Sequence, residues 1–250
     1  MRQWLGSIVF TLYLFVSVAI YGALVLLFTW PLPRRATYRA VLPWARSVMF
    51  MLRHVCRLDY VVEGREHVTE GTVVLMKHSS AWETIAQLLI FPNQTWVIKR
   101  ELMWAPVLGW VLALLKPIAI NRKGGATAVQ QVVAQGCRRL EEGFAVMIFP
   151  EGTRMSPGQT RRYGLSGAVL ASAAGRPVIP VAHNAGEFWP RRGWLKRPGT
   201  IRMVIGPPIG TADLDPRAIN ERAQRWIEAK VAEISGRPVA STGGAAEPAT

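Results

Sequence analysis

The sequence predicts an α/β fold: a largely parallel sheet flanked by helices and preceded by an N-terminal transmembrane or interfacial helical segment. Three observations lead to this prediction. Short, apolar, β-rich runs alternate with helical patterns between residues 60 and 234, which is typical of a parallel sheet with helical crossovers. Half of the 250 residues are hydrophobic, which is enough for a sizeable core. Residues 3–33 contain no charged side chain.

The uncharged N-terminal run is the first predicted element. Between Trp4 and Trp30 it is almost wholly apolar, and it exceeds the roughly 20 residues that span a bilayer as a helix. A cleaved signal peptide has an apolar core of about 7–15 residues ending in small side chains, whereas this run ends in Trp30 and Pro31. We therefore expect a retained membrane anchor. Arginines are more numerous after the run than before it, which predicts that the rest of the protein faces the cytoplasm. Only Arg2 precedes the run, and the arginines that follow are Arg34, Arg35, Arg39 and Arg46.

A second helix is expected over residues 43–58, with Pro43 in its first turn. Arg46, Arg53 and Arg57 are seven and four residues apart, so they share one face, and apolar residues cover the other. A basic amphipathic helix beside a membrane anchor is typical of a helix that lies on anionic headgroups. The same pattern fits a surface helix packed on the domain with its arginines in solvent. The sequence leaves both possibilities open.

The remaining chain divides into predicted strands and helices. Seven apolar runs are expected as strands: residues 60–62, 72–76, 96–98, 118–120, 145–149, 178–181 and 201–205. Four stretches are expected as helices: residues 81–90, 126–142, 165–174 and 216–234. Gly143 and Gly175 follow two of these patterns and fit helix C-terminal positions. The expected organisation is a membrane anchor and interfacial helix (1–58), an α/β domain (59–235) and a disordered tail (236–250) of small and polar residues.

Charge and cysteine usage narrow the function. The formal net charge is +14 and the sequence pI is about 10.8, which indicates an anionic partner: nucleic acid, an acidic membrane or a phosphorylated substrate. Cys56 and Cys137 are the only cysteines. They form no metal-binding motif and no disulfide framework, so they fit a reducing compartment.

The first chemical motif covers residues 77–84 and follows the apolar run 72–76. His78 and Glu83 are five residues apart, which is about 140° around a helix, so they can meet only if His78 lies in a loop and Glu83 in the first helical turn. Ser79 or Ser80 is expected to cap that helix. A histidine with a carboxylate on one ring nitrogen can accept a proton through the other. The helix N-terminus also offers N–H groups to an anionic intermediate.

A second motif, residues 149–154 with the sequence FPEGTR, also follows an apolar run. Gly152 allows the backbone to approach a ligand closely. Arg154 carries a planar set of donors that suits phosphate. Glu151 fits either a contact with a hydroxyl group or a brace for a basic residue. By itself each motif fits a strand followed by a charged turn, and it is their combination that indicates a site.

Together these stretches resemble the glycerolipid acyltransferase family, in particular the bacterial 1-acylglycerol-3-phosphate acyltransferases. Four ordered blocks carry the resemblance: residues 78–83, 116–122, 149–154 and 178–181. A fixed six-residue word such as FPEGTR arises by chance roughly once in tens of millions of windows at about 5% usage per residue. The resemblance covers residues 60–210, approximately the predicted α/β domain.

The resemblance implies a reaction and a location. An acyl group would pass directly from a thioester of coenzyme A or acyl carrier protein to the sn-2 hydroxyl of lysophosphatidic acid, giving phosphatidic acid. It implies no metal, no cofactor apart from the acyl donor, no acyl-enzyme and no nucleic acid. The expected partners are a membrane lipid substrate, the acyl donor and an anionic membrane surface. The expected location is the bacterial inner membrane, with the catalytic domain facing the cytoplasm.

The resemblance also implies roles for single residues. His78 would deprotonate the acceptor hydroxyl and Glu83 would fix the tautomer of His78. The residues implied for the acceptor phosphate are Lys99, Arg122 and Arg154. Those implied for the glycerol site are Glu151, Gly152 and Thr153. Residues 178–181 would line the acyl side.

The chain departs from the family pattern at two places. The acidic residue of the first block is usually aspartate and here is Glu83, so either the backbone compensates or the bond to His78 is looser. After the third block, the usual aromatic residue followed by lysine is replaced by Tyr163 and Gly164.

Two alternative functions are left open, and one is an acyltransferase that acts on another lysolipid acceptor. A non-enzymatic basic membrane protein is the other, but it leaves the two chemical motifs unexplained.

Overall fold

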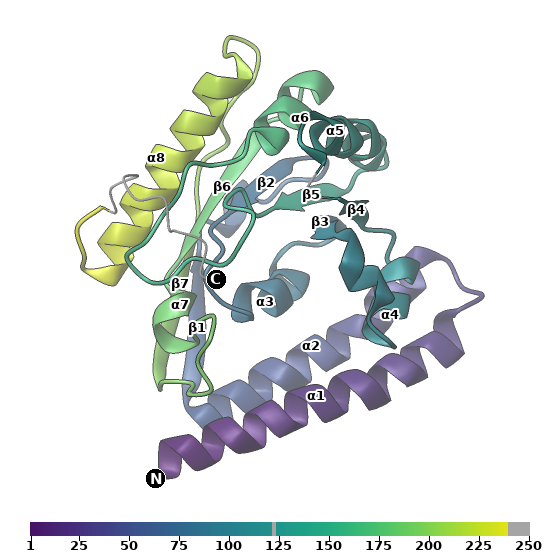
Figure 1. Ribbon diagram of the computed structural model, residues 1–250, viewed down its shortest axis with the longest axis vertical. Coiled ribbons are helices and arrows are strands. Elements are labelled where there is room, and N and C mark those ends of the chain that lie inside the picture. The colour runs from purple at the N-terminus through teal and green to yellow at the C-terminus, as the bar shows by residue number, and fades with distance from the viewer. Residues whose placement is uncertain (122–123, 240–250) are drawn as a thin grey trace.

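The computed structural model describes residues 1–121 and 124–239, which form a mixed sheet with helices on both faces (Figure 1). The strand order is β1-β7-β6-β2-β5-β3-β4. Neighbouring strands are parallel except for the antiparallel pair β6 and β7. Every predicted strand is confirmed, with shifts of one or two residues at some ends. The strands are β1 (Leu58–Glu63), β2 (Val73–Met76), β3 (Gln94–Lys99), β4 (Ile118–Ile120), β5 (Ala145–Ile148), β6 (Val178–His183) and β7 (Gly199–Ile205).

Helices cover the two faces of the sheet in two groups. Side chains alternate along a strand, so Val74 and Met76 of β2 pack with the group that contains α1 to α4 and α7. Val73 and Leu75 pack with α5, α6 and α8. Both faces are therefore buried, as in other largely parallel sheets. The helices are α1 (Arg2–Thr29), α2 (Arg34–Cys56), α3 (Trp82–Ile90), α4 (Leu108–Leu114), α5 (Ala126–Glu141), α6 (Ser166–Ala174), α7 (Ala185–Phe188) and α8 (Pro216–Ser235), with short 3-10 turns η1 (Arg65–His67) and η2 (Arg100–Trp104).

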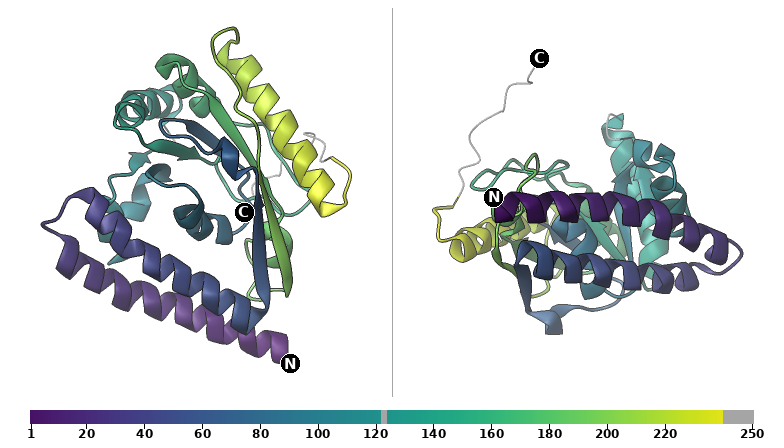
Figure 2. Two further views of the ribbon diagram at one scale, coloured as in Figure 1. Left: turned by 180° about the vertical axis from the view of Figure 1, so that it is seen from behind. Right: turned by 90° about the horizontal axis from the view of Figure 1, so that it is seen from below.

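The first two helices form an antiparallel hairpin. Figure 1 shows α1 as the outermost layer with α2 between it and the sheet, and Figure 2 shows the two helices running side by side. Near the middle of α1, the Tyr13 hydroxyl donates to Ser47 Oγ (2.7 Å). Nearer the turn of the hairpin, the Tyr21 hydroxyl donates to the carbonyl of Ala40 (2.9 Å). Among the described residues, α1 is the one helix long and apolar enough to cross a membrane. Helix α2, with 23 residues, runs beside most of the 28 residues of α1.

The hairpin is fastened to the domain at both ends. At its turn, the Arg34 guanidinium donates to the carbonyl of Leu115 (2.6 Å) and lies 3.8 Å from the centre of the Phe144 ring. At its open end, Ser7 accepts a hydrogen bond from the Lys196 N–H (2.9 Å). Phe10 of α1 belongs to the same buried cluster as side chains of the central strands β2 and β5. The orientation of the hairpin is thus set by the folded domain.

The expected start of the second helix at Pro43 is wrong. The helix begins at Arg34, and Pro43 lies inside it. An interior proline removes a backbone hydrogen bond and costs about 3 kcal/mol. This cost is offset by the apolar face of α2, because Val41, Ala45 and Val48 are buried against the domain. The sequence left open whether this helix lies on the membrane or packs on the domain. The buried face of α2 is packed on the domain.

The four helices predicted after residue 58 are confirmed within one residue at each end. Gly143 and Gly175 have positive φ angles of 81° and 58°, as expected after helix ends. The short helices α4 and α7 were not predicted. The predicted boundary between residues 58 and 59 lies one residue inside β1, whereas α2 ends at Cys56. Residues 240–250 of the expected disordered tail lie outside the described residues.

Candidate active site

The two chemical motifs meet at one edge of the sheet. Strands β2, β5, β3 and β4 are parallel, so their carboxyl ends share this edge. Register pairs Leu75 with Ile148 and Lys99 with Ile120. Adjacent strands lie about 4.8 Å apart, which brings the loop that starts at His78 beside the 149–154 loop. The two loops that were expected to form one site are therefore neighbours in the structure.

His78 and Glu83 form the predicted pair. His78 lies in the loop after β2 and Glu83 in the first turn of α3, with 2.9 Å between Nδ1 and Oε1. The same oxygen accepts the N–H groups of Ser79 (3.0 Å) and Ser80 (2.8 Å). Ser80 Oγ accepts the N–H of Trp82 (3.1 Å), but the N-cap residue of α3 is Ala81, so the expected capping by Ser79 or Ser80 is wrong. The N–H groups of Ser79 and Ser80, just before the helix, are used by Glu83, and that of Trp82, the first helical residue, is used by Ser80. These three N–H groups are therefore not free for an anionic intermediate.

This arrangement fixes the proton positions of His78. Burial opposes ionisation of Glu83, but His183, the hydrogen bond from His78 and the Ser80 N–H outweigh it, and the pKa of Glu83 is lowered. An ionised carboxylate only accepts hydrogen bonds, so Nδ1 of His78 carries the proton. Phe149 stacks on the imidazole, with 4.1 Å between ring centres. Nε2 of His78 is left with its lone pair as the site for a proton.

The longer carboxylate of Glu83 does not loosen the bond to His78. All three hydrogen bonds meet Oε1, and Oε2 has no hydrogen-bond partner among the described atoms. Nε2 of His183 lies 3.9 Å from Oε2. The backbone of the loop and the first turn of α3 thus accommodate the extra methylene.

The 149–154 loop is tied through its backbone to the 77–81 loop, which contains His78. The N–H of Met155 donates to the carbonyl of His78 (2.7 Å), and the N–H of Gly152 donates to the carbonyl of Phe149 (3.0 Å). Gly152 has φ +68°, a left-handed conformation that favours glycine. Thr153 and Arg154 follow on the partly exposed rim. The turn thus holds Thr153 and Arg154, two of the predicted substrate-binding residues, close to His78 in the structure.

Glu151 lies beneath the site and not on its surface. Its side chain is fully buried. The carboxylate accepts the backbone N–H of His78, at 3.2 Å from Oε2, and lies 3.2 Å from Nζ of Lys77. This geometry is that of a brace, one of the two roles expected for this residue. Because the carboxylate of Glu151 is buried, the structure does not support its predicted contact with the substrate.

The remaining predicted residues lie at different depths. Lys99 ends β3 at the site edge, with 51% of its side chain exposed and an ion pair to Glu101 at 3.4 Å. Arg122 lies outside the described residues. Residues 178–181 are fully buried within β6 and belong to the core. Among the described residues, no group of three or more metal-ligating side chains is placed to hold a metal ion.

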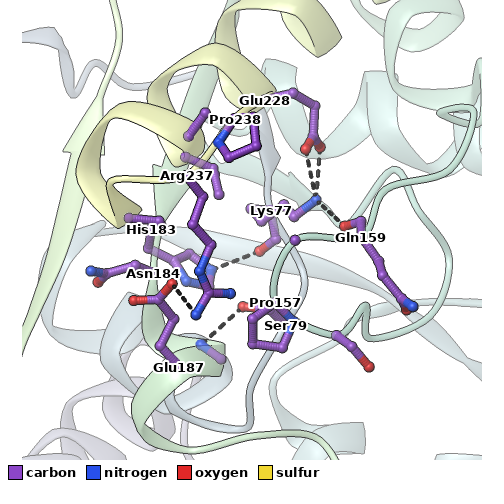
Figure 3. Close-up of a pocket in the computed structure, with 16 residues that line it drawn as sticks. Lys77, Ser79, Pro157, Gln159, His183, Asn184, Glu187, Glu228, Arg237 and Pro238 are labelled. Atoms are coloured by element: carbon purple, nitrogen blue, oxygen red, sulfur yellow. Dashed lines mark hydrogen bonds and ion pairs between the residues drawn. The ribbon is translucent and has the colours of Figure 1, made fainter. Parts of the chain in front are cut away.

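His183, at the end of β6, contacts the 77–81 loop. Its Nδ1 accepts the N–H of Ala185 (3.3 Å), so Nε2 carries the proton and donates to the carbonyl of Lys77 (2.8 Å). Burial lowers the pKa of His183, although Glu83 opposes this shift. Ser79 is held nearby, where its Oγ accepts the N–H of Gly186 (3.2 Å; Figure 3). His183 is therefore a structural histidine whose two ring nitrogens both have hydrogen-bond partners.

Sequence reasoning assigned no role to Lys77, Tyr163 or Glu228. All three are buried around Glu151. The signal for Glu228 was present, because it lies next to Ile227 and four residues before Ala232 on the side of the helix that buries its apolar residues. A glutamate on the apolar side of a helix calls for a buried partner.

Comparisons with known proteins agree with this geometry. The acyltransferase family model matches residues 59–184, which include both loops. The 1-acyl-sn-glycerol-3-phosphate acyltransferase of Pseudomonas aeruginosa is 44% identical over 238 residues, covering 93% of each chain. The protein of the same name from Limnanthes douglasii is 25% identical over 237 residues, covering 93% of this chain and 83% of that protein.

The fold also matches a solved structure. The crystal structure of the 1-acyl-sn-glycerophosphate (LPA) acyltransferase PlsC from Thermotoga maritima superposes with a TM-score of 0.78. The match covers 95% of this chain and 98% of that chain at 22% sequence identity. The family model spans half of the chain, and the relative from P. aeruginosa spans nearly all of it. With its histidine and glutamate joined at the end of β2, the chain belongs to the acyltransferase family.

Proposed function

We propose that this protein is a 1-acyl-sn-glycerol-3-phosphate acyltransferase. It moves an acyl group from a thioester to the sn-2 hydroxyl of 1-acyl-glycerol-3-phosphate and gives phosphatidic acid. The observation that carries this proposal is the pair His78 and Glu83, in which Glu83 holds Nδ1–H and leaves Nε2 as a base. Family membership and the names of the relatives from bacteria and plants support it.

The proposed mechanism is a direct transfer in which His78 is the catalytic base. Nε2 takes the proton of the sn-2 hydroxyl as the oxygen attacks the thioester carbonyl carbon. The tetrahedral intermediate collapses, the carbon–sulfur bond breaks, and the thiolate takes the proton from the imidazolium. Glu83 stabilises the imidazolium that forms in between and prevents the ring from adopting the other tautomer. The ester, the free thiol and the neutral histidine are the products of one cycle.

The acceptor phosphate is proposed to lie over the carboxyl ends of β5 and β3. Arg154 follows the turn of the 149–154 loop, and Lys99 ends the neighbouring strand β3. Arg122 is proposed as a third phosphate contact from the sequence pattern alone. Gly152 and Thr153 form the turn nearest His78 and are proposed to shape the glycerol site. Cationic side chains around a phosphate dianion supply charge-assisted hydrogen bonds.

The acyl donor is proposed to be a thioester of coenzyme A or acyl carrier protein. Both carriers are acidic, and the chain has a formal net charge of +14. Opposite charge accelerates encounter and is screened by salt. No metal and no further cofactor is needed for the proposed transfer.

The hairpin of α1 and α2 is proposed to lie along the membrane surface. The outer face of α1 exposes large apolar side chains, among them Leu12 at 64% and Phe15 at 70%. Arg39 and Arg46 of α2 are exposed beside it, and placing each in the bilayer centre costs about 2.5–3.5 kcal/mol or more. Because α2 runs beside most of α1, a crossing α1 would carry these arginines into the hydrocarbon. We propose that the catalytic domain faces the cytoplasm, where the acyl donors are made.

A substrate panel tests the proposed function. Purified protein receives palmitoyl-coenzyme A and one acceptor at a time: 1-oleoyl-glycerol-3-phosphate, 1-oleoyl-glycerol or a lysophosphatidylcholine. Thiol release is followed with a chromogenic disulfide, and the lipid product is identified by mass spectrometry. We expect thiol release that depends on 1-oleoyl-glycerol-3-phosphate and yields phosphatidic acid. Equal turnover of the phosphate-free acceptor would contradict the phosphate contacts, and no acceptor-dependent release would contradict the activity.

A further inference from the structure

A buried ionic cluster lies behind the catalytic loop and has no part in the chemistry described above. Its members are Lys77, Glu151, Tyr163 and Glu228. Nζ of Lys77 donates to both oxygens of Glu228 (2.8 and 3.0 Å) and lies 3.2 Å from Oε1 of Glu151. The three charged side chains are at most 6% exposed. Burying three charges is costly unless each finds a partner, so their placement demands an explanation.

The cluster is joined to the catalytic loop by a backbone hydrogen bond. The N–H of His78 donates to the carboxylate of Glu151, at 3.2 Å from Oε2 and 3.4 Å from Oε1. Lys77 precedes His78 in the chain, so the side chain of one and the backbone of the other converge on the same carboxylate. The position of the His78 backbone therefore depends on where Glu151 is held.

Glu228 holds Lys77 from the opposite side. It extends from α8 at the border of a cavity of about 30 Å³ lined by α7, α8 and residues 156–159, and it points toward Lys77 (Figure 3). The hydroxyl of Tyr163 donates to Oε1 of Glu228 (2.7 Å). Helix α8 lies beyond residues 59–184, the part that the family model matches. This support for the catalytic loop thus comes from outside the matched region.

We infer that Glu228 is a positioning residue for acyl transfer: by holding Lys77, it keeps the Glu151 carboxylate on the N–H of His78. The inference rests on the proposed function. Without the charge of Glu228, Lys77 pairs with Glu151 alone and draws that carboxylate away from the His78 backbone. The catalytic histidine then loses one of the contacts that fix its approach to the acceptor hydroxyl.

Because Glu151 is ionisable, the role proposed for Glu228 predicts a change in how the rate of acyl transfer depends on pH. The groups that face Glu151 are Lys77 at the end of β2, Glu228 from α8 and Tyr163 from the loop before α6. Burial raises the pKa of Glu151 to about 7, Lys77 opposes the shift and Glu228 adds to it. Glu151 therefore becomes charged, and a better acceptor for the His78 N–H, as the pH rises through about 7. Removing the charge of Glu228 is expected to lower the pKa of Glu151.

The test is Glu228→Gln in the full-length protein. The values of kcat and KM are measured with palmitoyl-coenzyme A and 1-oleoyl-glycerol-3-phosphate between about pH 6 and 9, a range that brackets the Glu151 titration. We expect kcat at the alkaline plateau to fall about tenfold while each KM changes less than about threefold. We also expect the acid limb of the kcat profile to move to lower pH. The matched control is Glu221→Gln on the same helix, whose side chain is 65% exposed, and it should behave as wild type.

Two results would overturn the inference. An unchanged profile in Glu228→Gln would show that the residue does not act on the site. A lower plateau with an unmoved acid limb would indicate a purely structural role. If Glu228→Gln does not fold, Tyr163→Phe removes only one hydroxyl from the cluster, and we expect kcat to fall about threefold or more at constant KM. If the kcat of Tyr163→Phe equals that of the wild-type protein, the inference is wrong. If the wild-type protein itself shows no acyl transfer, the proposed function is wrong.

Discussion

The Glu83 carboxylate is held by three donors that all meet one of its oxygens. The imidazole of His78 and the N–H groups of Ser79 and Ser80 converge on Oε1. This explains how the chain uses glutamate where the family usually has aspartate: the loop and the first turn of α3 bring their donors to the longer side chain. The orientation of His78 thus depends on both the length and the charge of Glu83.

Two substitutions separate these contributions. Glu83→Gln removes the charge that stabilises the imidazolium, so we expect kcat to fall about a hundredfold or more, within the range for lost general-base support. Glu83→Asp keeps the charge and shortens the side chain, so measurable activity should remain. Initial rates of thiol release measure both, with circular dichroism as a check on folding. Equal rates for wild type and Glu83→Gln would remove the carboxylate from the mechanism.

The residues of the site were predictable to different degrees. The five-residue spacing of His78 and Glu83 required a loop and a first helical turn, and the structure confirms this arrangement. The direction of the Glu151 side chain was not predictable, because it depends on Lys77 and on Glu228, which lies 151 residues from Lys77 in the chain. Contacts across such a separation follow from packing, which local patterns do not contain.

At the scale of elements, α8 carries its own stop and start signals. Asp215 precedes the helix, and its Oδ1 accepts the N–H of Ala218 (2.8 Å). Pro216 occupies the first turn, and Gly236 follows the helix with a φ of 60°. These signals explain why the predicted span of this helix agrees with the structure to within one residue. They are absent at the start of α2, where Pro33 provides no side-chain cap, and there the prediction was wrong.

The cap of α8 can be tested by Asp215→Ala. The substitution leaves the Ala218 N–H without its acceptor, and loss of such a cap costs about 1 kcal/mol. For a protein of this size, we expect the melting temperature to fall by about 2–4 °C. Differential scanning calorimetry in detergent measures the change. An unchanged melting temperature would mean that water replaces the carboxylate at no cost.

In the molecule as a whole, exposed large apolar side chains are concentrated on α1 and on the segment from η2 to α4. The outer face of α1 is exposed, and the segment from η2 to α4 adds further large apolar residues: Leu102, Trp104, Leu108 and Trp110. Exposed apolar surface of this extent marks an interaction site. The ties at Arg34 and Ser7 hold the hairpin against the domain. A membrane bound by this surface would therefore meet the active site in one orientation.

Weakening the apolar face of α1 is expected to weaken membrane binding. In the double variant Leu12→Gln and Phe15→Gln, two large exposed side chains no longer enter the bilayer. Each contributes about 1.5–3 kcal/mol when buried, so we expect at least a tenfold loss of binding to phosphatidylglycerol vesicles. Vesicle sedimentation measures it, and turnover of a dispersed short-chain acceptor should be unchanged. The matched control is Val61→Gln at the sheet edge, also exposed, and equal binding by control and double variant would contradict the proposed surface.

The role of His78 as the base is tested by the single-turnover rate of acyl transfer by His78→Ala. Enzyme in excess is mixed with palmitoyl-coenzyme A and 1-oleoyl-glycerol-3-phosphate, and phosphatidic acid is quantified over time. Because His78 is proposed to take the proton of the acceptor hydroxyl, we expect the rate to fall about a hundredfold or more, with vesicle binding and melting temperature unchanged. Transfer at the wild-type rate in His78→Ala would contradict the assignment of His78 as the base.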